Sequence, residues 1–233
     1  MLSLRKFLNK KIVLVFVIFL ILIVGGLFFW WQIDEIDSFI ERKKIEKMVA
    51  PSKDYSMIEN YDGEFIINEK DRLKIKIPAG WEVGVNEDME ILESSREVIL
   101  YSKNFSYRPP EGCSITIQVN RLQRTPIEKY KEGRSFIMYL FEGAEEIKEM
   151  IGSYKESTLE EKESMQKKGI EIILIDQRDA LKEVVFSNED VGRYITVKIP
   201  TDNRLYVFGS MQLSETCNKE FDEFLRTISI NPD

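Results

Sequence analysis

A run of twenty uncharged residues, Ile12–Trp31, constrains this chain more than any other feature of its sequence. Sixteen of the twenty are Ile, Leu, Val or Phe. A helix of this length spans roughly 30 Å, which matches the hydrocarbon thickness of a bilayer. Trp30 and Trp31 end the run, where amphipathic rings favour the headgroup region. The pattern predicts a single transmembrane helix, so the lipid bilayer is the first expected partner.

The charges on the two sides of this run differ in sign. Basic residues precede it at positions 5, 6, 10 and 11, and acidic residues follow it at positions 34, 35 and 37. The positive-inside rule then predicts a cytoplasmic leader, residues 1–11, and places everything from residue 32 outside the cell membrane. The alternative is a cleaved signal peptide, whose apolar region is normally about 7–15 residues and ends at small residues. Here Gly25-Gly26 is followed by LFFWW, so we expect an uncleaved, single-pass anchor.

A helical pattern continues beyond the run. Ile33, Ile36, Ile40 and Met48 follow near-helical spacing without an intervening Pro or Gly, and Pro51 stops the helix. Residues 52–62 are polar and predict a linker. We therefore divide the chain into a leader at 1–11, a transmembrane helix at 12–31, a helical stalk with linker at 32–62 and an extracytoplasmic domain at 63–233.

The outer domain carries the alternating pattern of antiparallel strands. Leu73, Ile75 and Ile77 alternate with Lys74 and Lys76, as expected for a half-buried strand. Similar β-rich runs predict strands at 82–85, 96–102 and 113–120, and a four-stranded meander between 169 and 213. A loop is expected at Tyr107–Gly112, and a surface turn at Arg178-Asp179.

Two helices are expected among these strands. Thr125-Pro126 is a helix start whose apolar stripe runs to Gly152. Ser214 is expected to cap a second helix, Glu215–Thr227. Residues 153–168 are nearly all polar and fit either a loop or a short exposed helix. The fold class is therefore α+β, an antiparallel sheet flanked by helices behind a transmembrane helix.

The two cysteines, Cys113 and Cys217, are far apart in the sequence. In an oxidising compartment such a pair is a disulfide candidate, which would close a loop of about one hundred residues. Two inert thiols are the main alternative. Redox chemistry is disfavoured because there is no C-x-x-C motif.

The outer part is acidic, and the whole chain lacks histidine. All four basic residues of the leader precede the anchor, so the remaining 29 basic and 40 acidic residues give a net charge of −11. This charge argues against nucleic acid as a partner. Without histidine, Ser-His-Asp systems and His-based metal sites are excluded. The adjacent carboxylates Glu145-Glu146, Glu160-Glu161 and Glu189-Asp190 are expected to be solvated charges. We predict no catalytic residue, cofactor or metal.

The order of elements resembles a known family. A basic alternating strand precedes Ile77-Pro78-Ala79-Gly80-Trp81, followed by a helix, a meander and the C-terminal EFDEFLRTISI. This order, over residues 63–230, is similar to the PsbP-like family, which includes the extrinsic photosystem II subunit and envelope-anchored bacterial proteins. The resemblance implies an α-β-α sandwich used as a docking scaffold. Metal-binding histidines of plant members have no counterpart here, because the chain has none.

Two functional hypotheses remain. The first is a non-catalytic, membrane-anchored binding or assembly module with a protein partner in the cell envelope. The second is an extracytoplasmic small-ligand sensor, or an enzyme that uses carboxylates in a pocket. For the first hypothesis, the candidate partner-binding loop consists of Tyr107, Arg108, Pro109 and Pro110. The aromatic residues Phe136, Tyr139 and Phe141 are expected to pack in the core rather than line a ligand groove.

Overall fold

The structure is a computed structural model that divides into two units, Met1–Ile45 and Glu46–Asp233. It describes residues 19, 22–23, 40, 43, 46–85, 98–107, 110–124, 142–188, 192–212 and 215–230. The five described residues of the first unit are helical. Among the described residues, no helix is both long and apolar enough to cross a membrane. Apart from Phe19, Leu22 and Ile23, the predicted span Ile12–Trp31 lies outside them.

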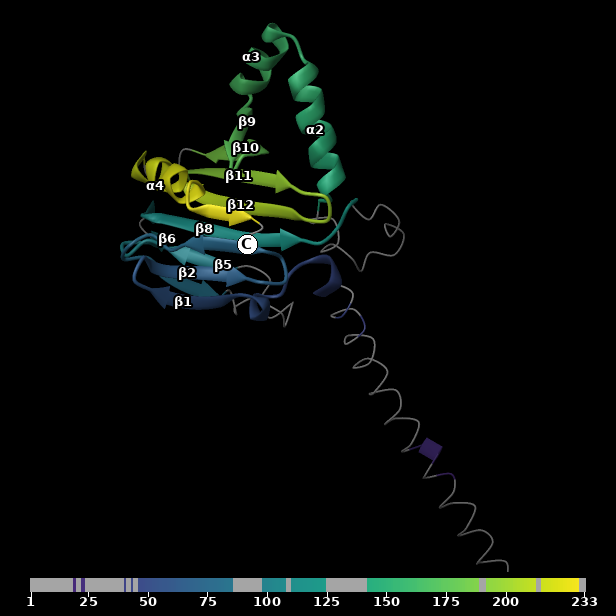
Figure 1. The fold of residues 1–233 in the computed structure, drawn as a ribbon, viewed down its shortest axis with the longest axis vertical. Helices are drawn as coiled ribbons and strands as arrows, with labels where there is room; N and C mark the ends of the chain where they lie inside the picture. The colour runs from purple at the N-terminus through teal and green to yellow at the C-terminus, as the bar shows by residue number, and fades with distance from the viewer. Residues whose placement is uncertain are drawn as a thin grey trace, which may run out of the picture. The chain divides into compact units, whose positions relative to one another are not determined.

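The second unit contains two antiparallel sheets (Figure 1). The smaller sheet has the order β1-β2-β3-β13. Its strands are β1 (Ser56–Asn60), β2 (Gly63–Asn68), β3 (Leu73–Lys76) and β13 (Ile228–Ile230). Alternation in β3 buries Leu73 and Ile75, as its sequence predicts.

The larger sheet has seven strands in the order β4-β5-β8-β12-β11-β10-β9. They are β4 (Glu82–Val85), β5 (Val98–Tyr101), β8 (Cys113–Asn120), β9 (Ile170–Ile175), β10 (Arg178–Asn188), β11 (Gly192–Pro200) and β12 (Leu205–Gln212). The predicted meander is confirmed, because β9 to β12 are consecutive neighbours in this sheet. A separate two-stranded ribbon joins β6 (Ser106–Tyr107) to β7 (Pro110–Glu111).

Helices lie on both faces of the seven-stranded sheet. On one face, Ile147 and Ile151 of α2 (Ala144–Glu156) form a small cluster with Leu181 and Leu205. On the other face, α4 (Glu215–Leu225) and the four-stranded sheet enclose the main core, in which Phe208 and Phe224 make an edge-to-face contact. The α+β class, with an antiparallel sheet flanked by helices, is therefore confirmed.

The expected linker at 52–62 is wrong as a description of this segment. Ser52–Asp54 form a short 3-10 helix, η1, and Ser56–Asn60 form the edge strand β1 of the smaller sheet. The strand was missed because all five of its residues are exposed, so its sequence does not alternate. The compact unit starts at Glu46 rather than at residue 63.

Three other boundaries differ from expectation. The predicted helix start, Thr125-Pro126, lies outside the described residues, and helix α2 begins at Ala144. It continues past Gly152 to Glu156, and the segment beyond it forms a second helix, α3 (Leu159–Lys167). Arg178 and Asp179 are strand residues, because the turn before them is made by Asp176 and Gln177, both with positive φ. The C-terminal helix ends at Leu225, which leaves room for β13.

Candidate functional site

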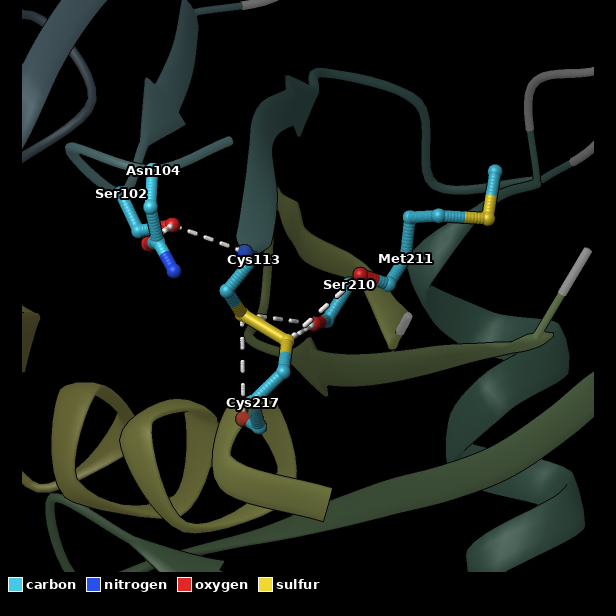
Figure 2. Close-up of a disulfide and its surroundings, with 6 residues drawn as sticks. All are labelled: Ser102, Asn104, Cys113, Ser210, Met211 and Cys217. Atoms are coloured by element: carbon cyan, nitrogen blue, oxygen red, sulfur yellow. Dashed lines mark hydrogen bonds between the residues drawn. A yellow bond between two sulfur atoms is a disulfide. The ribbon is translucent and has the colours of Figure 1, made fainter. Parts of the chain in front are cut away.

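The cysteine pair forms a disulfide between Cys113 and Cys217 (Figure 2). Cys113 is the first residue of β8, and Cys217 lies in the first turn of α4. The bond therefore links this helix covalently to an inner strand of the larger sheet. Both residues are fully buried, and the Ser210 hydroxyl lies 3.5 Å from the Cys217 sulfur. In the chain-entropy model, a loop of this length contributes about 4–5 kcal/mol. The bond is buried, and the chain has no further cysteine that could exchange with it, so we assign it a structural role.

The candidate partner loop is only partly described. Tyr107 and Pro110 pair with each other in the β6–β7 ribbon, so the expected irregular loop contains short strands. Arg108 and Pro109, between them, lie outside the described residues. So do Glu189-Asp190 and the aromatic residues Phe136, Tyr139 and Phe141. The pairs Glu145-Glu146 and Glu160-Glu161 lie in the first turns of α2 and α3, where negative charge is favourable.

A buried ion cluster lies where the chain enters the second unit; we call it the entry cluster, Asp54, Asp71, Arg121 and Arg204. Asp71 is fully buried and binds the Arg121 Nη2 and the Arg204 Nε, each at 2.7 Å. Arg121 Nη2 also lies 2.7 Å from Asp54 Oδ2. Burial alone would raise the pKa of Asp71, but the hydrogen bonds from the two arginines outweigh it and lower that pKa. The same balance, with Lys70 and Arg121, lowers the pKa of Asp54.

The entry cluster and the strand end beside it also hydrogen-bond the main chain of residues 46–50. Arg121 Nη1 donates to the Glu46 carbonyl at 3.1 Å, and the Arg121 N–H donates to the Met48 carbonyl at 2.6 Å. The Ala50 N–H bonds the Val119 carbonyl at 2.9 Å. Because each buried carboxylate faces a cation and its pKa is lowered, the cluster suits structure rather than proton transfer.

A second buried charge lies on the α2 face of the larger sheet. Lys198 is 8% exposed and makes ion pairs with Glu142 at 2.7 Å and Glu183 at 2.6 Å. Burial would lower the pKa of Lys198, but the two glutamates raise it. Thr196, two residues away on the same strand face, has a buried hydroxyl without a hydrogen-bond partner in the structure. These groups form a small polar strip on this face of the sheet.

An apolar site lies beneath the helical hairpin made by α2 and α3, which projects from the sheet in Figure 1. Ser157 ends α2, and Thr158 caps α3 in a capping box with Glu161. Between the hairpin and β9–β10 is a cavity of about 470 Å³. We call it the hairpin groove; its lining is Glu146, Glu149, Met150, Ser153, Tyr154, Met165, Ile170 and Leu181. The lining is mainly apolar, and carboxylates stand along α2.

Exposed apolar side chains extend from this groove onto the neighbouring surface. Met150 is 41% exposed, Leu159 at the start of α3 is 75% exposed, and Leu174 on β9 is 74% exposed. Large exposed apolar residues concentrated on adjoining elements mark interaction surfaces more often than isolated ones do. Met150 and Tyr154 lie four residues apart on one face of α2, and this spacing is a sequence signal for one wall of the groove. The sequence of α3 has no apolar stripe, so it gives no signal for the other wall.

A second cavity adjoins the Pro78-Ala79-Gly80-Trp81 turn. Its volume is about 410 Å³, and its walls include Trp81, Phe224, Lys76 and two glutamates of α4. Trp81 is half-buried against the core. In the described part of the chain, no group of three or more acidic or cysteine side chains is placed to hold a metal ion.

Comparison with known proteins identifies no family. No family model matches the chain, and no curated protein matches it. A crystal structure of a protein from Bacteroides thetaiotaomicron VPI-5482 has 12% sequence identity and a TM-score of 0.36. The match covers 70% of this chain and 46% of that one, so this chain aligns with less than half of the Bacteroides protein. The PsbP-like resemblance stays a prediction.

Proposed function

We propose that this protein is a non-catalytic binding or assembly module, anchored in the cell membrane by Ile12–Trp31, with its folded unit outside. A partner protein of the cell envelope docks in the hairpin groove. The observation that carries the proposal is the groove itself, an apolar concavity whose lining includes the exposed Met150. The buried disulfide supports an oxidising compartment, and the charge order around the apolar run supports the orientation.

The described carboxylates favour binding over catalysis. A general acid or base at neutral pH needs a pKa shifted towards neutrality, usually by burial away from cations. Asp54 and Asp71 have lowered pKa values beside arginines, and Glu142 and Glu183 neutralise a buried lysine. Each of these four carboxylates therefore has a cationic partner in the fold. Helices on both faces of an antiparallel sheet are also compatible with the PsbP-like scaffold, which we retain as part of the proposal.

The test is photo-crosslinking from the full chain in intact membranes. A photoreactive phenylalanine analogue at Met150 should yield a discrete adduct, whereas the same analogue at Tyr61, 96% exposed on the β1–β2 turn, should not. Met165→Glu, which puts a charge in the groove, should abolish the adduct. Met57→Glu, on the exposed strand β1, should leave it unchanged. Equal labelling from both positions, or no adduct from Met150, would contradict docking in the groove.

A small-ligand sensor is the second candidate, and the unpartnered Thr196 hydroxyl beside Lys198 favours it. A neutral ligand carrying a hydroxyl or amide would complete that hydrogen bond without adding a charge beside the Lys198 ion pairs. The measurement is thermal denaturation against a panel of amino acids and monosaccharides. Stabilisation should disappear in Thr196→Val and persist in Ser164→Ala, on exposed α3. A panel without any stabilising compound argues against a sensor.

A further inference from the structure

Strand β9 is an edge strand with an unusually apolar sequence. Five of its six residues are Ile or Leu, in the order Ile-Glu-Ile-Ile-Leu-Ile. It pairs with β10 through six residues without a register shift, and no described strand pairs with its other edge. Natural edge strands are normally protected by Lys, Pro or a bulge, because free N–H and C=O groups recruit further strands. Strand β9 has none of these features, and Leu174 is 74% exposed.

The hydrogen-bond phase of β9 determines which residues are free to pair. The Val184 N–H donates to the Gly169 carbonyl at 3.0 Å, which continues the β9–β10 register by one pair. In an antiparallel ladder, bonded and non-bonded pairs alternate. Residues 169, 171, 173 and 175 therefore direct their backbone groups towards β10. Ile170, Ile172 and Leu174 direct theirs outwards.

We propose that a second copy of this chain adds its own β9 to this edge, antiparallel and around a two-fold axis at Ile172. In this register Ile170 bonds Leu174 of the copy, Ile172 bonds Ile172, and Leu174 bonds Ile170. All three outward residues of each strand then exchange both backbone hydrogen bonds. The two seven-stranded sheets become one continuous sheet, and the inference stands independently of the partner proposed for the groove.

Charge selects this register over its neighbours. Glu171 is the single charged residue of β9, and around Ile172 it lies opposite Ile173 of the copy. Shifting the axis to Glu171 would place two carboxylates directly opposite each other, which is destabilising. Shifting it to Ile173 would leave Ile170 without a partner. Only the axis at Ile172 uses every outward group without opposing like charges.

The pairing also covers apolar side chains that are half-buried or, at Leu174, exposed in the monomer. Ile170 and Ile172 pack with the small cluster under α2, and alternation places Leu174 on the same face. Opposite residues share a face, so the three side chains of each copy form one apolar row across the axis. Edge strand β1 is a weaker candidate, because Ser56, Glu59 and Asn60 make three of its five residues polar.

Cysteine crosslinking in the full chain tests this register. In Ile172→Cys the two sulfurs meet across the axis, where Cα atoms about 5.5 Å apart permit a disulfide. The native cysteines do not compete, because they are bonded to each other. In Leu174→Cys, the matched control, the two positions lie four residues apart along the strands, roughly 13 Å. Mild oxidation in detergent micelles should give a covalent dimer from Ile172→Cys and little from Leu174→Cys.

A mass measurement completes the test. It distinguishes pairing through β9 from association through the apolar run Ile12–Trp31 alone. The wild-type chain should have the protein mass of a dimer in micelles. Leu174→Lys should shift it towards monomer, whereas Leu159→Lys, equally exposed on α3, should not. A monomeric wild type overturns the proposal. So does equal crosslinking at positions 172 and 174, or a dimeric mass without any Ile172→Cys crosslink.

Discussion

The entry cluster and the α2–α3 hairpin are attached to the same sheet in opposite ways. The entry cluster buries the carboxylates of Asp54 and Asp71 and half-buries Arg121 and Arg204, and each of the four groups has a counter-charge and further hydrogen bonds. The hairpin buries only three residues of α2 and none of α3, and it exposes Met150 and Leu159. Buried charge is costly unless it is paired, so the first region tolerates little change. Exposed apolar residues can be substituted with little effect on the stability of the monomer, and their role is to contact other molecules.

The largest effect that separates these regions is expected from Asp71→Asn. This change leaves Arg121 and Arg204 without their shared buried carboxylate, a loss that typically costs about 3–5 kcal/mol. Urea unfolding of the full chain in micelles, followed by tryptophan fluorescence, should show that decrease. Asp202→Asn, on a side chain that is 96% exposed, should change the unfolding free energy by less than about 0.5 kcal/mol. A similar small change in both variants would mean that the cluster does not stabilise the fold.

This contrast also separates what the sequence predicts from what it does not. Strands β3 and β8 were predicted because their apolar residues alternate, and the disulfide because two cysteines stand alone in a chain with an expected outer domain. The entry cluster had no such signal. Asp71 lies 50 residues from Arg121 and 133 from Arg204, so only the folded topology brings them together.

The hairpin shows a different limit. Helix α3 has no buried residue, so it lacks the apolar stripe by which helices are usually identified. Its start was nonetheless encoded, because Thr158 and Glu161 have the spacing of a capping box. Strand β1 has neither signal; it is a strand only because β2 pairs with it through a two-residue turn. Local patterns therefore predicted the covered elements better than the exposed ones.

Acid should weaken the entry cluster. The pKa values of Asp54 and Asp71 are lowered in the folded state, so their contribution is complete above the unfolded value of about 4 and is lost as pH falls below it. The unfolding free energy should be nearly constant from pH 7 to about 5 and should decrease below about pH 4. In Asp71→Asn this decrease should be smaller, because one of the two titrating groups is gone. If the unfolding free energy fell equally with acid in the variant and the wild type, other carboxylates would be responsible for the loss.

The smallest expected effect belongs to the hairpin. Thr158→Ala removes the hydroxyl that accepts from the Glu161 N–H and donates to the Glu161 carboxylate. Loss of such a cap costs about 1 kcal/mol, and because α3 buries nothing, the cost should stay local. Amide hydrogen exchange should therefore accelerate in α3 by roughly five-fold, with unchanged protection in β8 and β12. Ser164→Ala, in the middle of the same helix, should leave exchange unchanged. If Thr158→Ala also lowered protection in β8, the hairpin would be part of the same cooperative unit as the entry cluster, and the comparison between them would fail.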